Sequence, residues 1–369
     1  MKQKICCMFN YNPSYRLPIY YEMAKHLDCE FYFGDNVFEQ LKQFDAKMLP
    51  GFKSYLKAKK IGNSFVWFSG IRQVLKNKYS IYILTGSPGL LANWIILFYS
   101  KVYKKKVYCW CHGPKSYRND LMTKIVTAPF FRAMTGIFLY NKYNENFLLP
   151  LGVDENKIYI IHNSLNTDVQ TTLYKSLEQT SIYKNHFGNS NPVIIFIGRI
   201  QKRMKVQLLV EAVERMRNEG VQTNMVLVGP YMDGEDIEAL VRNKGLENNT
   251  WFYGASYEED ITAELLYNAD VCVAPGTVGL TAIHSLSYGT PVITNNNFSA
   301  IGPEFEAIKP GETGDFFIEN DVDSLVDCIK KWINLPDYDR QLVRVTARAE
   351  IEKNWSIEYQ INLLQKVLL

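Results

Sequence analysis

Short apolar runs alternate with amphipathic stretches along the first half of the chain. Residues 4–9 (KICCMF) predict a buried strand, the loop NYNPSYR follows, and apolar positions with helical spacing then cover residues 17–27. The same criteria predict an apolar helix over 90–99 and strands over 29–33, 80–84, 106–111, 136–140 and 157–161. This strand–loop–helix–strand order is typical of a parallel sheet covered by helices.

The alternation starts again after a polar stretch. Residues 170–191 contain no apolar strand, so we expect an interdomain linker there. The second half then predicts helices over 206–218, 235–244, 258–268 and 280–288, and strands over 192–198, 224–229, 250–253, 269–274 and 291–294. Short connections between alternating strands and helices indicate a second doubly wound parallel sheet.

Length and composition agree with this organisation. A chain of 369 residues with 47% hydrophobic and 21% charged residues suits two globular α/β domains. The seven cysteines are an odd number, lack a disulfide spacing and lie mostly in apolar runs, as expected of free thiols in a reduced intracellular protein. Cys109 and Cys111 are predicted side by side on one strand without further ligands, so we assign no metal site. The N-terminus is not typical of a signal peptide, and the apolar run 90–99 is too short to cross a bilayer.

The charge is divided unevenly between the two halves. Residues 1–190 carry a net charge of +13 and residues 191–369 carry −10. This asymmetry suggests two domains with different partners, the basic half facing a phosphorylated lipid at a membrane surface or a nucleic acid. The alternative is a pair of solvated surfaces whose opposite charges steady each other. The basic residues are spread without a recognition motif, which argues against nucleic acid.

Ligands of doubly wound sheets bind beyond the carboxyl ends of the strands, so the loops after strands are the candidate site. The loop that includes Gly276, Val278 and Gly279 precedes a helix that begins with Leu280 and Thr281. Glycines allow close approach of the backbone, and a helix N-terminus presents amide N–H groups, which together suit a diphosphate.

Two further loops carry candidate chemistry. Arg199 follows the strand 192–198, and Arg203 and Lys205 lie close behind it, which favours a phosphate ligand over a merely solvated basic loop because the rest of this half is acidic. His112 follows the strand 106–111 and precedes a glycine. A histidine there can hydrogen-bond a sugar hydroxyl or a developing charge without a metal, although a lone histidine is more often structural.

With these residues in view, the chain resembles the family 4 glycosyltransferases, which are retaining enzymes with the GT-B double-Rossmann fold. The resemblance covers nearly the whole chain and is strongest in residues 195–315. FIGRIQKRMKVQLLVEA resembles the family's phosphate-binding segment, PGTVGLTAIHSLSYGTPVI its donor loop, and KIYIIHNSLNTD the turn before its linker. NWSIEYQINLLQ resembles the terminal helix that crosses back to the first domain.

The resemblance implies two Rossmann-like domains whose parallel sheets face each other across a cleft. Residues 1–185 would bind the acceptor, residues 186–350 the nucleotide-sugar, and residues 351–369 would form the crossing helix. The family has two glutamates eight residues apart, the first on the transferred sugar and the second on the ribose; here these positions are Gly276 and His284. The usual lysine falls at Met204, so Arg203 or Lys205 would take its place.

The activity implied is that of a retaining hexosyltransferase. It would move a sugar from a nucleoside diphosphate sugar to a glycan or polyprenyl-diphosphate-linked acceptor in cell-surface polysaccharide synthesis, without a metal or another cofactor. Arg199, Lys205 and the amides of residues 276–281 would bind the diphosphate, His284 the ribose, His112 the transferred sugar, and Arg16, in the loop after the first strand, the acceptor. Asp321 or Asp323 is better explained as a helix N-cap than as a metal ligand.

The basic half also suggests where the protein works. We expect a cytoplasmic protein at the inner face of the membrane, with Lys53, Lys57, Lys59 and Lys60 near residues 65–68 as a contact surface for anionic lipid. Two other functions stay open at this point. One is a nucleotide-sugar epimerase on the same fold, and the other is a non-catalytic sugar- or lipid-binding protein, which the missing glutamates motivate.

Overall fold

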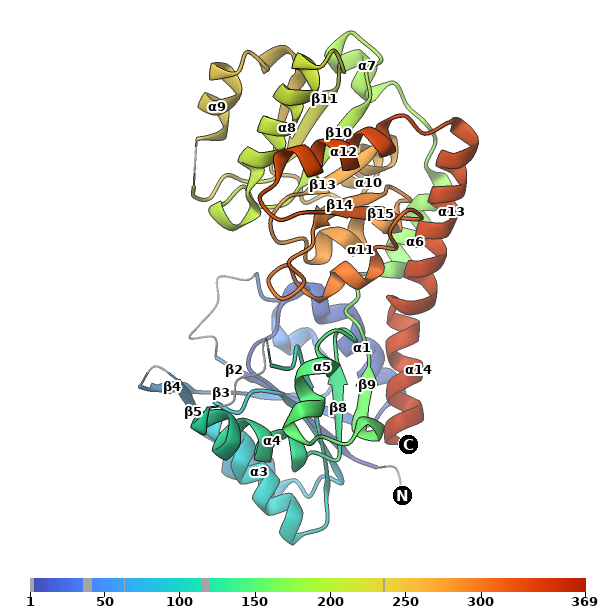
Figure 1. The fold of residues 1–369 in the computed structure, drawn as a ribbon. Coiled ribbons are helices and arrows are strands. Elements are labelled where there is room, and N and C mark those ends of the chain that lie inside the picture. The colour runs from blue at the N-terminus through green and yellow to red at the C-terminus, as the bar shows by residue number, and fades with distance from the viewer. Residues whose placement is uncertain (1–2, 36–41, 63, 115–119, 235) are drawn as a thin grey trace. The chain divides into compact units, whose positions relative to one another are not determined.

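The chain folds into two compact units. The computed structural model describes residues 3–35, 42–62, 64–114, 120–234 and 236–369. Unit 1 comprises Met1–Leu165 together with Ile357–Leu369, and unit 2 comprises Asn166–Ser356 (Figure 1). Each unit is a parallel sheet with helices on both faces, so the predicted pair of doubly wound domains is confirmed.

The sheet of unit 1 has seven parallel strands in the order β3-β2-β1-β6-β7-β8-β9. Their bounds are β1 Ile5–Phe9, β2 Cys29–Gly34, β3 Phe52–Leu56, β6 Ile81–Thr85, β7 Lys106–Cys111, β8 Gly136–Leu139 and β9 Ile158–Ile160. A separate antiparallel hairpin consists of β4 (Ala58–Ile61) and β5 (Phe65–Phe68).

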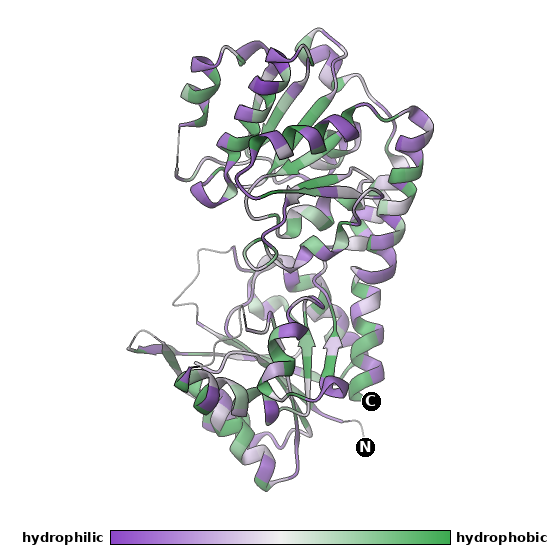
Figure 2. Ribbon diagram, viewed as in Figure 1, coloured by the Kyte–Doolittle hydropathy of each residue, from purple (hydrophilic) through white to green (hydrophobic). Residues whose placement is uncertain are grey.

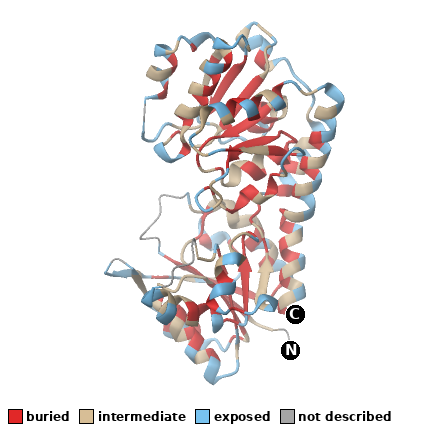
Figure 3. Ribbon diagram, viewed as in Figure 1, coloured by how far each residue is buried: buried red, intermediate tan, exposed pale blue. Residues whose placement is uncertain are grey.

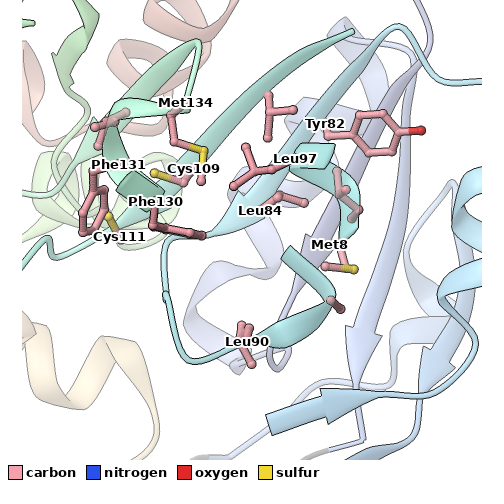
Figure 4. Packing of buried hydrophobic residues seen from close by; sticks show 14 of the residues in the cluster. Met8, Tyr82, Leu84, Leu90, Leu97, Cys109, Cys111, Phe130, Phe131 and Met134 are labelled. Atoms are coloured by element: carbon pink, nitrogen blue, oxygen red, sulfur yellow. The ribbon is translucent and has the colours of Figure 1, made fainter. Parts of the chain in front are cut away.

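Helices cover both faces of this sheet. Side chains of α1 (Leu17–His26) and α14 (Ile357–Leu368) share one core with alternate residues of the strands. The other core is closed by α2 (Ile71–Lys76), α3 (Leu91–Val102) and α4 (Ala128–Arg132), and Figure 4 shows Phe130, Phe131 and Met134 packed near Cys109 and Cys111 in it. The two thiols are thus core side chains, as expected of apolar cysteines. The short α5 (Glu145–Leu148) follows β8.

Unit 2 repeats the plan with six parallel strands in the order β12-β11-β10-β13-β14-β15. The strands are β10 Val193–Ile197, β11 Asn224–Val228, β12 Thr250–Gly254, β13 Val271–Ala274, β14 Val292–Asn295 and β15 Gly314–Phe317. One face carries the core shared with α8 (Val206–Asn218), α9 (Ile237–Asn243) and α12 (Val322–Ile333). The remaining helices are α6 Thr167–Ser176, α7 Ile182–Phe187, α10 Glu259–Asn268, α11 Leu280–Ser287 and α13 Asp337–Asn354.

The hydrophobic pattern explains both sheets directly. Their strands are largely apolar in Figure 2 and buried in Figure 3, because a parallel strand is covered on both of its faces. Short single-turn helices complete the connections: η1 Ser14–Arg16, η2 Ala46–Met48, η3 Thr123–Thr127, η4 Leu149–Leu151, η5 Glu155–Lys157, η6 Lys202–Met204, η7 Glu247–Asn249 and η8 Pro303–Ala307.

The structure corrects the linker predicted over 170–191. This stretch contains the last part of α6 and all of α7, and both helices belong to unit 2, so the boundary lies at residue 165/166 instead of 185/186. Helix α6 is held by polar contacts, such as the hydrogen bond from Gln170 to Glu259 (3.1 Å), and therefore has no apolar stripe to detect. The chain returns to unit 1 at Ile357 instead of residue 351.

The start of α12 and the length of the apolar helices were also predicted. Asp321 is the N-cap of α12, where its carboxylate accepts a hydrogen bond from the Ser324 amide (2.9 Å), as predicted. Within the described residues, no helix has the length and apolar character needed to cross a membrane.

Candidate functional site

Both sheets reverse their strand order beside their first strand. The reversal lies between β1 and β6 in unit 1 and between β10 and β13 in unit 2. At such a point the loops of the two neighbouring strands turn to opposite faces of the sheet and leave a crevice where ligands bind. The candidate residues of each unit lie at or near this edge.

In unit 2 the loops after β10, β11 and β12 are hydrogen-bonded to one another. The Gly198 amide donates to the Val228 carbonyl (2.9 Å), and the Gly229 amide donates to the Gly254 carbonyl (2.8 Å). Beyond these strand ends lies a cavity of about 330 Å³, within the range of small-molecule sites. It is lined by Ile200, Leu227, Gly229, Pro230, Tyr231, Ile237, Glu238, Phe252, Gly254 and Ala255.

The three predicted cations of unit 2 differ in their surroundings. Lys205 Nζ pairs with Glu319 Oε1 (2.7 Å) and donates to Asn320 Oδ1 (2.7 Å), which keeps Lys205 within the protein. Hydrogen bonds from Lys205 and Asn297 hold the pKa of Glu319 below its usual value. Arg203 is exposed. Arg199 is partly buried at the end of β10, and across the described residues it makes no hydrogen bond, ion pair or ring contact. Arg199 is therefore the predicted cation best placed to receive an anionic ligand.

Gly276 is packed against the loop that carries the cations. Its amide donates to the Met204 carbonyl (3.0 Å), and the Thr277 amide donates to the Arg203 carbonyl (3.3 Å). A Cβ atom at Gly276 would lie 2.1 Å from the Arg203 carbonyl oxygen, closer than real Cβ atoms approach. The loop therefore has no room for a glutamate at the position where the resembling family has its first one.

Most of the predicted amide cradle is already used within the chain. The amides of Val278 and Gly279 both donate to the Ile301 carbonyl (3.1 and 3.2 Å), and the Thr281 amide donates to the Val278 carbonyl (3.2 Å). In the described part of the chain, Leu280 is the predicted residue whose amide has no acceptor. The cradle predicted from residues 276–281 is thus reduced to the N–H of Leu280, because the turn needs the others for its own hydrogen bonds.

His284 meets a carboxylate from a neighbouring helix. Its Nε2 lies 3.0 Å from Glu259 Oε1, and the same oxygen accepts hydrogen bonds from the Tyr288 hydroxyl (2.7 Å) and from Gln170 (3.1 Å). Burial alone would raise the pKa of Glu259, but His284, Tyr288 and Gln170 outweigh burial and lower it to about 2. A carboxylate thus lies beside the family's second glutamate position, supplied by α10 instead of α11.

Unit 1 has a cavity of about 310 Å³ at the carboxyl ends of β1, β6, β7 and β8. Arg16 and His112, the two predicted residues of this unit, both line it. The wall also contains several aromatic rings that the sequence did not indicate. The full lining is Phe9, Asn10, Tyr11, Pro13, Tyr15, Arg16, Tyr20, Thr85, Gly86, Ser87, Trp110, Cys111, His112, Gly113 and Tyr140.

The Arg16 guanidinium lies among these rings. Its Cζ is 5.1 Å from the centroid of Trp110 and 5.0 Å from that of Tyr140, within the range of cation–π contacts. Burial alone would lower the pKa of Arg16, but the neighbouring Tyr20 and Tyr15 outweigh it and the pKa is raised. Arg16 therefore stays charged at every physiological pH.

His112 is fixed by the end of β7 and by its neighbours. Its ring lies 4.6 Å from the ring of Tyr140, and its carbonyl accepts a hydrogen bond from Asn144. The adjacent Gly113 has a φ of 74°, a left-handed conformation that favours glycine and lets the chain turn sharply at the strand end. This turn places the imidazole in the wall of the cavity instead of in the core.

Some site residues were not found from the sequence. Glu259 opens an ordinary amphipathic helix, and Trp110 and Tyr140 are indistinguishable from other aromatic strand residues. The available signal was position: Trp110 and Tyr140 lie at or just after the ends of neighbouring parallel strands, the edge at which ligands bind.

Known proteins resemble this chain in sequence and in fold. Residues 178–348, which lie within unit 2, match the family described as Glycosyl transferases group 1. An uncharacterised 41.2 kDa protein in the cps region of Klebsiella pneumoniae is 25% identical over 272 residues, which cover 70% of each chain.

Solved structures resemble the whole chain. HepE from Anabaena in complex with UDP superposes with a TM-score of 0.71 at 14% identity and 99% coverage of both chains. The lipopolysaccharide outer core galactosyltransferase WaaB superposes with a TM-score of 0.68 at 15% identity and 98% coverage of both chains.

The two parallel-sheet units therefore define a protein with the GT-B fold. The match of residues 178–348 to the group 1 glycosyltransferases, together with this fold, supports the resemblance noted in the sequence. Assignment to family 4 stays a prediction.

Proposed function

We propose that the protein transfers a hexose from a nucleoside diphosphate sugar, with UDP as the nucleotide, to a glycan or polyprenyl-diphosphate-linked acceptor in cell-surface polysaccharide synthesis. Structures of HepE with UDP and with UDP-glucose support the choice of donor. The name of WaaB and the genetic location of the Klebsiella relative support the polysaccharide setting.

The observation that carries the proposal is Arg199 at the end of β10, whose side chain has no partner among the residues that the structure describes. When the bond between the sugar and the diphosphate breaks, negative charge grows on the leaving phosphate oxygens. A guanidinium fixed there before reaction stabilises that charge more in the transition state than in the ground state. The adjacent cavity beyond β10, β11 and β12, with Tyr231 and Phe252 in its wall, suits the nucleoside.

We assign the remaining residues the roles that the resembling family implies for their positions. The Leu280 amide contacts the diphosphate, and the pair of Glu259 and His284 contacts the ribose hydroxyls in place of the family's second glutamate. In unit 1, we propose that His112 hydrogen-bonds a sugar hydroxyl and that Arg16 binds the acceptor. The acceptor hydroxyl attacks the anomeric carbon on the face from which the diphosphate departs, and its proton passes to a phosphate oxygen of the leaving group, so the anomeric configuration is retained. This chemistry calls for neither a protein nucleophile nor a metal.

Thermal stability in the presence of nucleotides tests the donor site. UDP-, GDP- and ADP-sugars and the free diphosphates are added to the full chain, since a ligand that binds the folded state raises the Tm by mass action. We expect one nucleotide series to raise the Tm and Arg199→Ala to abolish the rise. Arg242→Ala removes an exposed arginine on α9 of the same unit and should leave the rise unchanged.

The same experiment separates the proposal from its rivals. Absence of any rise at millimolar nucleotide would contradict the donor site. A rise without transfer or hydrolysis of the sugar favours a non-catalytic binding protein. Conversion of the donor to a second nucleotide-sugar without acceptor identifies an epimerase.

We also propose that unit 1 contacts an anionic bilayer, at the inner face of the membrane. No Asp or Glu occurs between Asp45 and Asp120, while this stretch carries 14 Lys and Arg. On the hairpin, Lys59 and Lys60 are exposed. Helix α3 contacts β5 of the hairpin and exposes 72% of Phe98 to solvent, so apolar and basic groups lie on adjoining elements. This combination suits anionic headgroups and the acyl boundary beneath them.

Sedimentation with vesicles tests this contact. The protein should bind vesicles that contain phosphatidylglycerol more tightly than vesicles of phosphatidylcholine alone. Lys59→Glu with Lys60→Glu should weaken binding, because each lysine near the surface contributes about 1 kcal/mol. The matched control, Lys353→Glu with Lys366→Glu, makes the same change in charge on α13 and α14. If both variants lose vesicle affinity equally, the binding depends on net charge alone and the proposed contact surface is contradicted. Lys53 is left out of the test because it pairs with Glu30 (2.8 Å).

A further inference from the structure

The cavity of unit 1 holds a positive charge, Arg16, that no described acidic residue balances. Among the described residues, the Arg16 guanidinium has two hydroxyl neighbours, Tyr20 (3.4 Å from Nη1) and Tyr15, although it carries five N–H donors. Among the residues that the structure describes, no Asp or Glu pairs with it, and none lines the cavity. The aromatic rings of Trp110 and Tyr140 also lie within cation–π distance of the guanidinium.

Such an arrangement is costly unless a ligand completes it. A cation that is partly withdrawn from water and lacks a counter-ion loses hydration without gaining an ion pair. An oxyanion in the cavity would use the idle N–H donors, and the planar guanidinium matches a carboxylate or phosphate with two parallel hydrogen bonds. A cationic ligand would be repelled, and a neutral ligand would leave the charge unpaired.

The rest of the cavity suits a sugar ring. Trp110 and Tyr140 line it and are nearly buried (3% and 4% exposed), so they form an apolar floor of the cavity. Asn10 and Thr85 add polar groups at the ends of β1 and β6. The Asn10 backbone amide donates to Thr85 Oγ1 (3.0 Å) and that hydroxyl donates to Asn10 Oδ1 (3.2 Å), which fixes both side chains. The wall thus combines apolar faces, small polar groups and one cation.

We propose that this cavity binds an acceptor that carries an oxyanion, a carboxylate or a phosphate, close to its accepting sugar, and that Arg16 binds the oxyanion. The identity of this ligand as the acceptor rests on the proposed function. The binding of an anionic sugar at Arg16 does not, because the cavity lies within unit 1.

Calorimetric titration of the full chain with three probes tests the inference: methyl glucoside, methyl glucuronide and glucose 1-phosphate. Hydrogen bonds to a charged group should make at least one anionic probe bind about tenfold to a hundredfold more tightly than the neutral one. Preference for the glucuronide identifies a sugar carboxylate, and preference for the phosphate identifies a phosphate. Equal affinity for all three probes in the unaltered protein overturns the inference, and this outcome needs no variant.

Variants of Arg16 show whether the preference comes from this side chain. Arg16→Met should abolish the preference for the anionic probes over methyl glucoside, and Arg16→Lys should keep part of it. A preference that survives in Arg16→Met overturns the inference. Circular dichroism confirms that each variant is folded.

Nucleotide binding separates this inference from the proposed function. If UDP-sugars raise the Tm but the anionic probes bind no better than methyl glucoside, the inference fails and the donor site stands. If no nucleotide binds but the preference depends on Arg16, the anion site stands and the proposed transfer reaction fails.

Discussion

Replacement of Gly276 by alanine probes the packing that separates this chain from the glycosyltransferases it resembles. The added Cβ would lie 2.1 Å from the Arg203 carbonyl oxygen and 2.7 Å from the Met204 backbone, so the two loops must move apart. Overpacking of this kind costs about 1–3 kcal/mol. The movement also weakens the bonds from the Gly276 and Thr277 amides, which contribute about 1 kcal/mol each. We expect a total loss of about 2–4 kcal/mol.

Urea unfolding followed by circular dichroism measures this loss. At an m-value of about 2–3 kcal/mol/M, the midpoint should fall by about 1 M. The matched control is Gly220→Ala in the same unit, where no atom lies within 4 Å of the added Cβ and only the left-handed backbone (φ 85°) is strained. That strain costs about 1 kcal/mol. If Gly276→Ala is no less stable than Gly220→Ala, the packing argument is refuted. Gly276→Glu should fail in the same way, so the family's first glutamate cannot be restored by one substitution.

Three further predictions concern unit 2 and the thiols. Glu259 has a folded pKa of about 2, below its ordinary value of 4.5, so its contribution to stability is present above about pH 4.5 and is lost as the pH falls towards 2. Glu259→Gln should remove this part of the acid dependence of Tm. An unchanged profile of Tm against pH would contradict the pairing with His284. Arg348 donates to the Ser287 carbonyl (2.8 Å) and stacks on Tyr174, so Arg348→Ala should cost about 2–3 kcal/mol in urea unfolding, whereas Arg242→Ala should cost almost nothing. All seven cysteines are buried and free, so a thiol reagent should label none quickly in the folded protein and all seven in urea; rapid labelling of the native state would disprove their burial.

Much of the fold could be predicted because its signal is local. A strand covered on both faces must be apolar over its whole length, so β1, β7 and β10 are visible in a window of a few residues. Helix α8 was predicted with the bounds it has, because its six buried residues repeat with helical spacing. Helix α6 was missed for the opposite reason: its buried residues, Thr167 and Gln170, are polar.

The candidate site could be predicted only in outline. The loops after β7 and β10 follow from strand order and the rule that ligands bind at carboxyl ends, and this was enough to select His112 and Arg199. The partners of each cation could not be predicted. Lys205 and Arg199 look alike in the sequence, yet Lys205 is paired with Glu319, 114 residues further along the chain.

The sequence by itself therefore determined the two doubly wound sheets and the strand ends where chemistry can occur, since hydrophobic periodicity depends on near neighbours. Tertiary structure decided which groups at those ends are free. It left Arg199 without a partner among the described residues, brought Glu259 to His284 and placed aromatic rings beside Arg16. It also filled the space at Gly276 with the Arg203 backbone. These outcomes depend on contacts between distant segments, which no local pattern records.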